Sequence, residues 1–212
     1  MNTTLIGRLW PQTVTSTLSQ LLMVIAGTLL LAVSAKVQVP FWPVPMTMQT
    51  FVVLLIGASC GARLAGATVA AYLVEGAIGL PVFAGTTQFM NFFLTIYSGP
   101  DGFALLYNSA GLKYMAGPTG GYLAGFFIAA LVVGWLADRG FGRTIATTLA
   151  AFLIGEVIIF ALGVGWLAGG FPGLGLQKAL AAGLVPFLPA EALKMALACA
   201  VLPLAWRTKM RG

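Results

Sequence analysis

The stretch 144–167, which reads TIATTLAAFLIGEVIIFALGVGWL, contains a single ionisable side chain, that of Glu156. A helix of about 20 mostly apolar residues is long enough to cross the hydrocarbon core of a bilayer. The stretch does not alternate between polar and apolar residues, as the strands of a membrane β-barrel do. It therefore predicts a transmembrane helix that buries an acidic group near its middle.

The composition of the whole chain agrees with that prediction. Of the 212 residues, 59% are hydrophobic and 8% are charged, and the mean hydropathy is +0.98. Soluble domains carry about 25% charged residues, because water must wet their surface. We therefore expect an integral membrane protein whose solvent is mostly lipid.

Several residue types that carry enzymatic or metal chemistry are missing or isolated. The chain has no histidine, which is the most frequent metal ligand and a common general base. Cys60 and Cys199 stand alone in apolar runs, so neither a disulfide framework nor a zinc site is expected. The sequence contains no Walker A motif, and its basic residues form no patch for nucleic acid. The expected protein is not an enzyme, uses no cofactor or metal and binds no nucleic acid.

Further apolar runs predict the rest of the fold. Together with 144–167 they give six candidate spans, the other five being 17–35, 47–62, 64–78, 117–137 and 189–206. The 27 glycines suit close helix packing, which in lipid relies on small residues. Pairs such as Gly57 and Gly61, or Ala62 and Gly66, have the spacing for it. The predicted fold class is all-α, a single membrane domain over 1–212 built as a compact bundle of six transmembrane helices.

The first run allows a second interpretation. Arg8 followed by 17–35 has the order of a secretory signal peptide, and 33–35 resembles a cleavage site. The run is long for a signal peptide, and no soluble domain follows Lys36. We therefore favour a membrane span.

The positions of the lysines and arginines predict the orientation. Cytoplasmic loops of membrane proteins carry an excess of these residues. With the N-terminus inside, seven lie on the cytoplasmic side and three outside, the inner ones being Arg8, Arg63, Arg139, Arg143, Arg207, Lys209 and Arg211 and the outer ones Lys36, Lys113 and Lys178. Both termini are then cytoplasmic, as an even number of spans requires.

The outer connections hold the unusual sequence. Residues 37–46 place Pro40, Pro43 and Pro45 among large apolar side chains. Proline fixes φ and favours an extended conformation in the residue before it. We predict a stiff, apolar, extended lid that packs on the bundle or on a ligand. The next connection, 81–116, is rich in aromatic residues suited to the membrane interface, and the third, 169–187, contains a predicted short helix near 176–182.

Ionisable side chains inside the spans point to a binding site. A charge in mid-bilayer costs about 2.5–3.5 kcal/mol on insertion scales. Glu191 and Lys194 are three residues apart, so they share a face of the last span near the lid. They form either a self-neutralising ion pair or a polar site that faces a small molecule. Glu156 has no partner nearby in sequence, and it is protonated, hydrogen-bonded across the bundle or part of that site.

Five segments resemble those of a known family. The lid and the residues after it read PFWPVPMTMQT over 40–50, and 117–126 reads GPTGGYLAGF. Similar stretches lie at 61–66, 72–85 and 163–168. In these segments the chain resembles the BioY family, the biotin-specific substrate-binding subunits of energy-coupling factor (ECF) transporters, over about residues 17–207.

The resemblance implies a six-helix protein of the bacterial cytoplasmic membrane that captures biotin from outside. The implied partners are membrane lipid, a transmembrane coupling subunit and two cytoplasmic ATPases, although some family members are thought to work without dedicated partners. The family's acid and lysine on the last helix carry over to Glu191 and Lys194.

The chemistry of biotin suggests roles for further residues. Glu191 can accept a ureido N–H, and Lys194 or Lys113 can pair with the carboxylate or the ureido oxygen. The candidates for the apolar lining are Phe41, Phe83, Tyr122 and Trp166, each of which packing alone would also explain.

Two alternatives stay open. The protein could be the binding subunit for a different vitamin. It could also be an intramembrane enzyme with Glu156 as its acid–base group, although neither a histidine nor a polar cluster in the sequence supports that.

Overall fold

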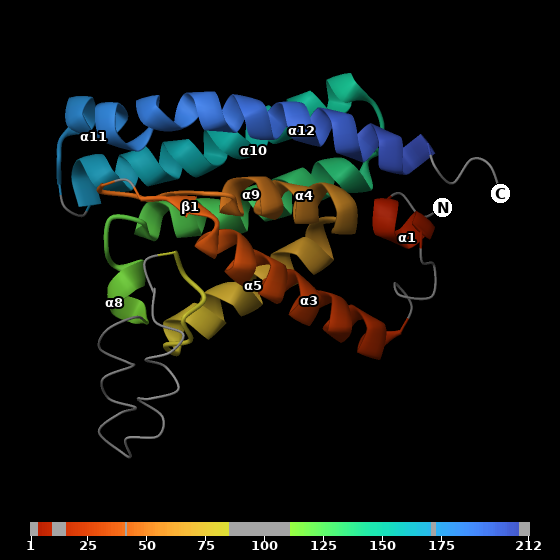
Figure 1. The fold of residues 1–212 in the computed structure, drawn as a ribbon. Helices are drawn as coiled ribbons and strands as arrows, with labels where there is room; N and C mark the ends of the chain where they lie inside the picture. The colour runs from red at the N-terminus through yellow and green to blue at the C-terminus, as the bar shows by residue number, and fades with distance from the viewer. Residues whose placement is uncertain (1–3, 10–15, 41, 85–110, 171–172, 208–212) are drawn as a thin grey trace, which may run out of the picture.

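The computed structural model describes residues 4–9, 16–40, 42–84, 111–170 and 173–207 (Figure 1). The described part is almost entirely helical. Its long helices are α3 (Thr17–Lys36), α4 (Gln49–Cys60), α5 (Ala62–Ala77), α9 (Gly120–Asp138), α10 (Ile145–Gly165) and α12 (Leu188–Arg207). The short elements are α1 (Leu5–Leu9), α8 (Leu112–Met115), the π-helical turn η1 (Trp166–Gly170), α11 (Leu176–Gly183) and the 3-10 turn η2 (Val185–Phe187).

Each predicted span corresponds to one long helix, and the predicted all-α class is confirmed. The short helix expected near 176–182 is α11. By length and composition, four stretches are able to cross a membrane alone, and they are Thr17–Lys36, Gly120–Asp138, Ile145–Gly170 and Leu176–Arg207. Because α4 and α5 are shorter, the count of six spans stays a prediction.

Helix α9 lies at the centre of the bundle and packs against α10, α4 and α5. Small residues allow these contacts. A Cβ on Gly125 of α9 would lie 2.8 Å from the Ile159 Cα of α10, and one on Gly57 of α4 would lie 3.2 Å from Val133. Close approach of backbones is how helices in lipid gain packing contacts. Gly57 therefore has the packing role expected of it, whereas Gly61, its partner in the predicted pair, forms the turn after α4.

The turn between α4 and α5 lies before its predicted position. The predicted spans 47–62 and 64–78 leave Arg63 between them, whereas in the structure Gly61 alone separates the two helices. Gly61 has φ +82°, a conformation that favours glycine. The carboxylate of Asp138, at the end of α9, accepts the Ala62 N–H at 3.1 Å and ties this turn to α9.

The outer surface of the bundle is apolar. Large hydrophobic side chains are exposed along α3 and α12, among them Leu18, Leu22, Leu29, Val33, Leu193, Leu197 and Leu204. Soluble monomers rarely expose contiguous apolar areas of this kind. The surface suits contact with lipid.

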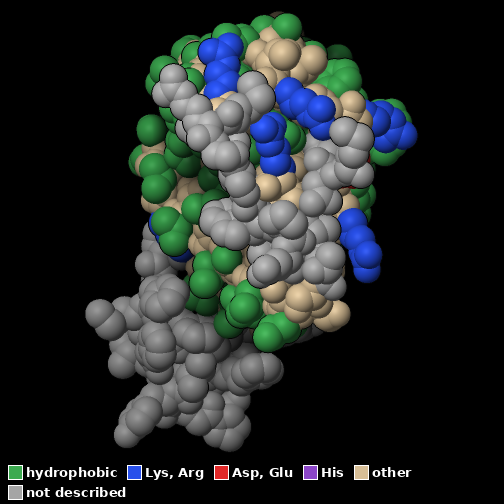
Figure 2. Space-filling view, turned by 90° about the vertical axis from the view of Figure 1, so that its right-hand side faces the viewer, with side chains coloured by type: hydrophobic (Ala, Val, Ile, Leu, Met, Phe, Trp, Pro, Cys, Tyr) green, Lys and Arg blue, Asp and Glu red, His purple; other side chains and the backbone are tan. Residues whose placement is uncertain are grey.

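The two ends of the bundle differ. Figure 1 places both termini at one end, and β1, α8 and α11 at the other. Figure 2 faces the end with the termini, where arginine side chains gather. The described arginines there include Arg8 of α1, Arg139 and Arg143 between α9 and α10, and Arg207 of α12.

The lid forms a small hairpin at the opposite end. Strands β1 (Gln38–Val39) and β2 (Met46–Thr47) pair antiparallel, with Gln38 opposite Thr47. The extended conformation was predicted from the prolines. The strand pairing was not, because a two-residue strand leaves no periodic pattern. Phe41, predicted to line a site, lies outside the described residues, as does most of the 81–116 connection.

Candidate ligand-binding site

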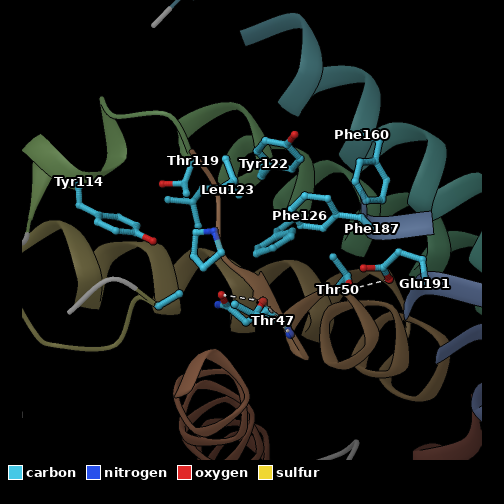
Figure 3. A pocket seen from close by; sticks show the side chains of 14 residues that line it. Thr47, Thr50, Tyr114, Thr119, Tyr122, Leu123, Phe126, Phe160, Phe187 and Glu191 are labelled. Atoms are coloured by element: carbon cyan, nitrogen blue, oxygen red, sulfur yellow. Dashed lines mark hydrogen bonds between the residues drawn. The ribbon is translucent and has the colours of Figure 1, made fainter. Parts of the chain in front are cut away.

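A cavity lies under the lid, at the end of the bundle opposite the termini (Figure 3). The space between its walls, including its opening to solvent, is about 450 Å³. The lid and the helical elements α4, α8, α9, α10, η2 and α12 contribute to its wall. The lining residues are Val44, Pro45, Thr47, Gln49, Thr50, Ala84, Tyr114, Thr119, Tyr122, Leu123, Phe126, Phe160, Phe187 and Glu191.

One side of the cavity is polar. Glu191, in the first turn of α12, lines the cavity and is 4% exposed. Its Oε1 pairs with Lys194 Nζ at 2.8 Å, and its Oε2 accepts the Thr50 hydroxyl at 2.9 Å. The carboxylate is therefore held between its own helix and the start of α4 (Figure 3).

Lys194 connects α12 to the lid. Besides Glu191, its ammonium donates to Thr50 Oγ1 at 2.9 Å and to the Thr47 carbonyl oxygen in β2. An ammonium has three donors, and all three are used by these acceptors. A carboxylate offers about four acceptor positions, so Glu191 can still accept a hydrogen bond from a ligand. In this state Glu191, rather than Lys194, is the group that is available to a ligand.

Aromatic side chains form another part of the wall. Tyr122, Phe160 and Phe187 form a chain of edge-to-face contacts, with centroids 6.0 and 5.8 Å apart. The Tyr122 hydroxyl donates to the Gly183 carbonyl at 2.7 Å, which leaves the ring as its contribution to the cavity. Figure 3 shows Phe126, Phe160 and Phe187 on the side of Glu191 and Thr50, whereas Tyr114 and Thr119 lie at the other side.

A second set of hydrogen bonds joins α3, α4 and α5 to the segment that follows α5. The Gln49 amide donates to the Tyr72 hydroxyl at 2.6 Å, and that hydroxyl donates to the Val82 carbonyl at 3.0 Å. Lys36, at the end of α3, donates to the Phe83 carbonyl at 2.8 Å. The bonds to the Val82 and Phe83 carbonyls hold the segment that follows α5 against α5 and α3.

The predicted site residues fall into different places. Tyr122 and Glu191 line the cavity, and Lys194 lies directly behind Glu191. Phe83 is 1% exposed and packs between Tyr72 and Tyr114, so it supports the wall without lining it.

Two predicted residues lie away from the cavity wall. The indole N–H of Trp166 donates to the Gly117 carbonyl at 2.9 Å, which ties η1 to the turn before α9. Lys113 is exposed on α8, next to Tyr114.

Glu156 lies one helical turn before Phe160 on α10 and is 7% exposed. Its carboxyl group is close enough to Glu191 for the two side chains to interact directly. The structure thus brings together three ionisable groups that the sequence singled out, from two helices.

Sequence reasoning missed several cavity residues. Thr47, Gln49 and Thr50 are polar residues at the start of an apolar run, directly after the prolines, and that position was a usable signal. Phe126 and Phe160 follow Tyr122 and Glu156 by four residues, so helical spacing places each on the same face as the residue before it.

The sequence contains a pattern that is typical of hydrolases, but the structure places it in a helix. Residues 57–61 match Gly-x-Ser-x-Gly, which in hydrolases lies on a strand-to-helix turn. Here Ser59 lies inside α4. Among the described residues no three His, Cys, Asp or Glu side chains are grouped as a metal site.

Comparisons with known proteins agree with this architecture. A sequence model of the BioY family matches residues 10–100 and 92–211. Biotin transporter BioY of Thermotoga maritima is 36% identical over 174 residues, 82% of this chain and 88% of that protein. Biotin transporter BioY of Rhizobium etli is 33% identical over 165 residues, 74% of this chain and 75% of that protein.

A solved structure has the same fold. It is described as the S-component for biotin from an ECF-type ABC transporter, and it superposes with a TM-score of 0.69 at 20% identity, over 92% of this chain and 93% of that one. Since the family model spans almost all of the sequence, and relatives above 30% identity cover more than two thirds of it, the chain belongs to the BioY family.

Proposed function

We propose that this protein captures biotin at the outer side of a bacterial cytoplasmic membrane, as the substrate-binding subunit of an ECF-type transporter. The observation that carries the proposal is a buried carboxylate, Glu191, in the wall of a mostly apolar cavity beneath the lid. The names of the relatives support biotin as the ligand, and the shared fold supports the role of a binding subunit.

The two sides of the cavity match the two parts of biotin. The ureido ring offers N–H donors, for which Glu191 is the acceptor. The thioether ring is apolar and fits against Tyr122, Phe126 and Phe160. Lys194 holds the Glu191 carboxylate in place, and its own donors are satisfied by the protein. Lys113, beside the cavity residue Tyr114, is the candidate cation for the carboxylate of biotin.

The proposal includes a topology of six spans with both termini in the cytoplasm. The cluster of arginines at the end with the termini supports it, since the cavity then opens outward. A Leu112→Cys variant, in a background with Cys60 and Cys199 replaced by serine, tests it with a thiol reagent that does not cross membranes. We expect labelling from outside the cell, and labelling from the cytoplasm alone would reject the topology.

The binding assay separates the proposal from its alternatives. The purified protein is titrated with biotin and with other vitamins in a calorimeter, and the bound biotin is then recovered and identified. We expect saturable binding of biotin, little binding of the others, and chemically unchanged biotin. A preference for another vitamin would reassign the ligand, and converted biotin would indicate an enzyme.

Transport itself requires a second experiment. Uptake of labelled biotin is compared in cells that express this chain alone and in cells that also express a coupling subunit with two ATPases. The proposal expects uptake to rise when the ATPases are present and to fall when they are inactivated. Equal uptake under all conditions would assign transport to this chain alone.

A further inference from the structure

Glu156 is a buried acid whose role the proposed binding chemistry leaves open. It lies on α10, inside the bundle, and the residue is only 7% exposed. Within the part of the chain that the structure describes, its Oε2 has no hydrogen-bond partner. A buried polar atom without a partner is costly, so a group of this kind calls for a specific explanation.

The surroundings of Glu156 hold two charged groups. Helix α10 packs against α9, α12, α4 and α11. Of the ionisable side chains on these helices, those that interact with Glu156 are Glu191 and Lys194 of α12. The others are remote or engaged. Asp138 accepts the Ala62 N–H, Tyr122 donates to the Gly183 carbonyl and Cys199 to that of Ile145, while Lys178 and Arg207 are exposed and Cys60 is the last residue of α4.

No hydrogen-bond donor among the described residues reaches Glu156 Oε2. Lys194 directs its donors to Glu191, Thr50 and the Thr47 carbonyl. None of them is directed at Glu156. An ionised carboxylate accepts hydrogen bonds but donates none, so two carboxyl groups bond to each other when one carries a proton. With that proton, two acids and one ammonium are also neutral overall, as a lipid-embedded site favours.

We propose that Glu156 is a positioning residue of the binding site: it keeps a proton, donates a hydrogen bond through it to the Glu191 carboxylate, and thereby makes biotin binding proton-linked. This inference rests on the proposed function. The proton fixes the Glu191 carboxylate against Thr50 and the lid, where it accepts the ureido N–H. When the proton leaves, two like charges face each other, Glu191 is displaced, and affinity falls. Biotin should therefore bind more weakly as the pH rises.

Glu156→Gln is the central variant, because the amide keeps a donor for Glu191 but does not titrate. Biotin is titrated at a series of pH values from about 6 to about 9.5 into the parent and the variant, in lipid nanodiscs. Above the pH at which the proton leaves, the parent should lose affinity about tenfold per pH unit, as one linked proton requires. The variant should match the parent at low pH and stay constant. Glu75→Gln, which changes an acid near the end of α5, should keep the pH dependence of the parent.

A second measurement does not depend on biotin. The infrared C=O stretch of a protonated carboxylic acid is recorded for the ligand-free parent and for Glu156→Gln at neutral pH. We expect this band in the parent and its loss in the variant, with the folded state of both checked by size exclusion.

The outcomes separate this inference from the function on which it rests. A parent without the band, a parent whose affinity does not fall with pH, or a Glu156→Gln variant with the pH dependence of the parent would each overturn the inference while leaving biotin binding intact. A band that is present in a protein that binds no biotin would confirm the proton on Glu156 and refute both the proposed ligand and the linkage.

Discussion

The two ends of the bundle differ in how the helices are connected and in where the charged side chains lie. At the end with the termini, a single glycine joins α4 to α5, and the arginines lie at the surface. There Arg139 stacks on Trp135 at 3.5 Å, and Arg8 and Arg143 lie over the Trp206 ring at 5.3 and 4.9 Å. At the lid end the chain is irregular and encloses a buried ion pair.

Irregular backbone at membrane depth is tolerated where it is buried in protein or lines a cavity. The lid end meets this condition, because Lys194 satisfies the Thr47 carbonyl and Tyr72 satisfies that of Val82. At the end with the termini the described turns are short, and the bond from the Ala62 N–H to Asp138 that supports one of them lies at the surface. The buried ion pair and its partners Thr47 and Thr50 thus gather where the backbone leaves the helical pattern, at the wall of the candidate site.

Removing the ion pair is expected to have the largest effect on the lid end. Lys194→Met leaves Glu191 charged and unpaired, and breaking a buried pair in this way costs about 3–5 kcal/mol of stability. Glu191→Gln removes a charged acceptor worth about 1.5–3 kcal/mol, which corresponds to a loss of biotin affinity of about ten- to a hundredfold. Thermal unfolding in detergent and biotin titration measure the two effects.

The double variant distinguishes structure from binding. Replacing both partners of a buried pair by neutral residues is often tolerated, so Glu191→Gln with Lys194→Met should be more stable than Lys194→Met alone and still bind poorly. If the folded double variant bound biotin as the parent does, the pair would be structural, and the site would have to be sought around Glu156 and Lys113.

Thr50→Val should have the next largest effect. The Thr50 hydroxyl donates to Glu191 and accepts from Lys194, and valine has the same shape without either bond. Loss of a bond to a charged group predicts affinity lower by about ten- to a hundredfold, toward the lower end because the ion pair persists. Thr68→Val is the matched control, since Thr68 is buried but bonds its own helix at Leu64. Equal effects of the two changes on biotin titration would refute a specific role for Thr50.

The sequence predicted the helices well because long apolar runs in lipid have few alternative structures. It also singled out Glu191, Lys194 and Glu156 as candidate site residues, because charged side chains inside such runs are rare. It could not show that Lys194 binds the Thr47 carbonyl, because that contact joins residues 147 positions apart. Aromatic residues were less informative: Phe83 packs behind the wall and Trp166 lies away from it, whereas Phe160 and Phe187 line it. In an apolar sequence nothing distinguishes a ring in a cavity wall from a ring in the core.

A smaller effect is expected from relaxing the lid. Pro45 lines the cavity between β1 and β2, and its ring restricts the open chain. Pro45→Gly adds conformational freedom worth about 0.4–1 kcal/mol to the lid when it is not closed. We therefore expect affinity lower by about two- to fivefold and a small loss of stability, no larger than about 1 kcal/mol. Calorimetric titration at one pH measures it. An unchanged affinity in the folded variant would show that the stiffness of the lid does not contribute to binding.

The smallest effect is expected at the end with the termini, and it tests whether the two ends are independent. Arg139 donates to the Trp135 carbonyl at 3.2 Å and stacks on the Trp135 ring. An exposed cation–π contact is worth about 0.5–1 kcal/mol, so Arg139→Gln should lower the melting temperature slightly. Biotin affinity should stay within about twofold of the parent, because no bond of Arg139 reaches the described cavity residues. One arginine of the cluster is also too few to reverse the charge bias, so the orientation of the chain should not change. A tenfold loss of affinity in a correctly oriented variant would mean that the end with the termini influences the site. The hypothesis that the two ends are independent would then be wrong.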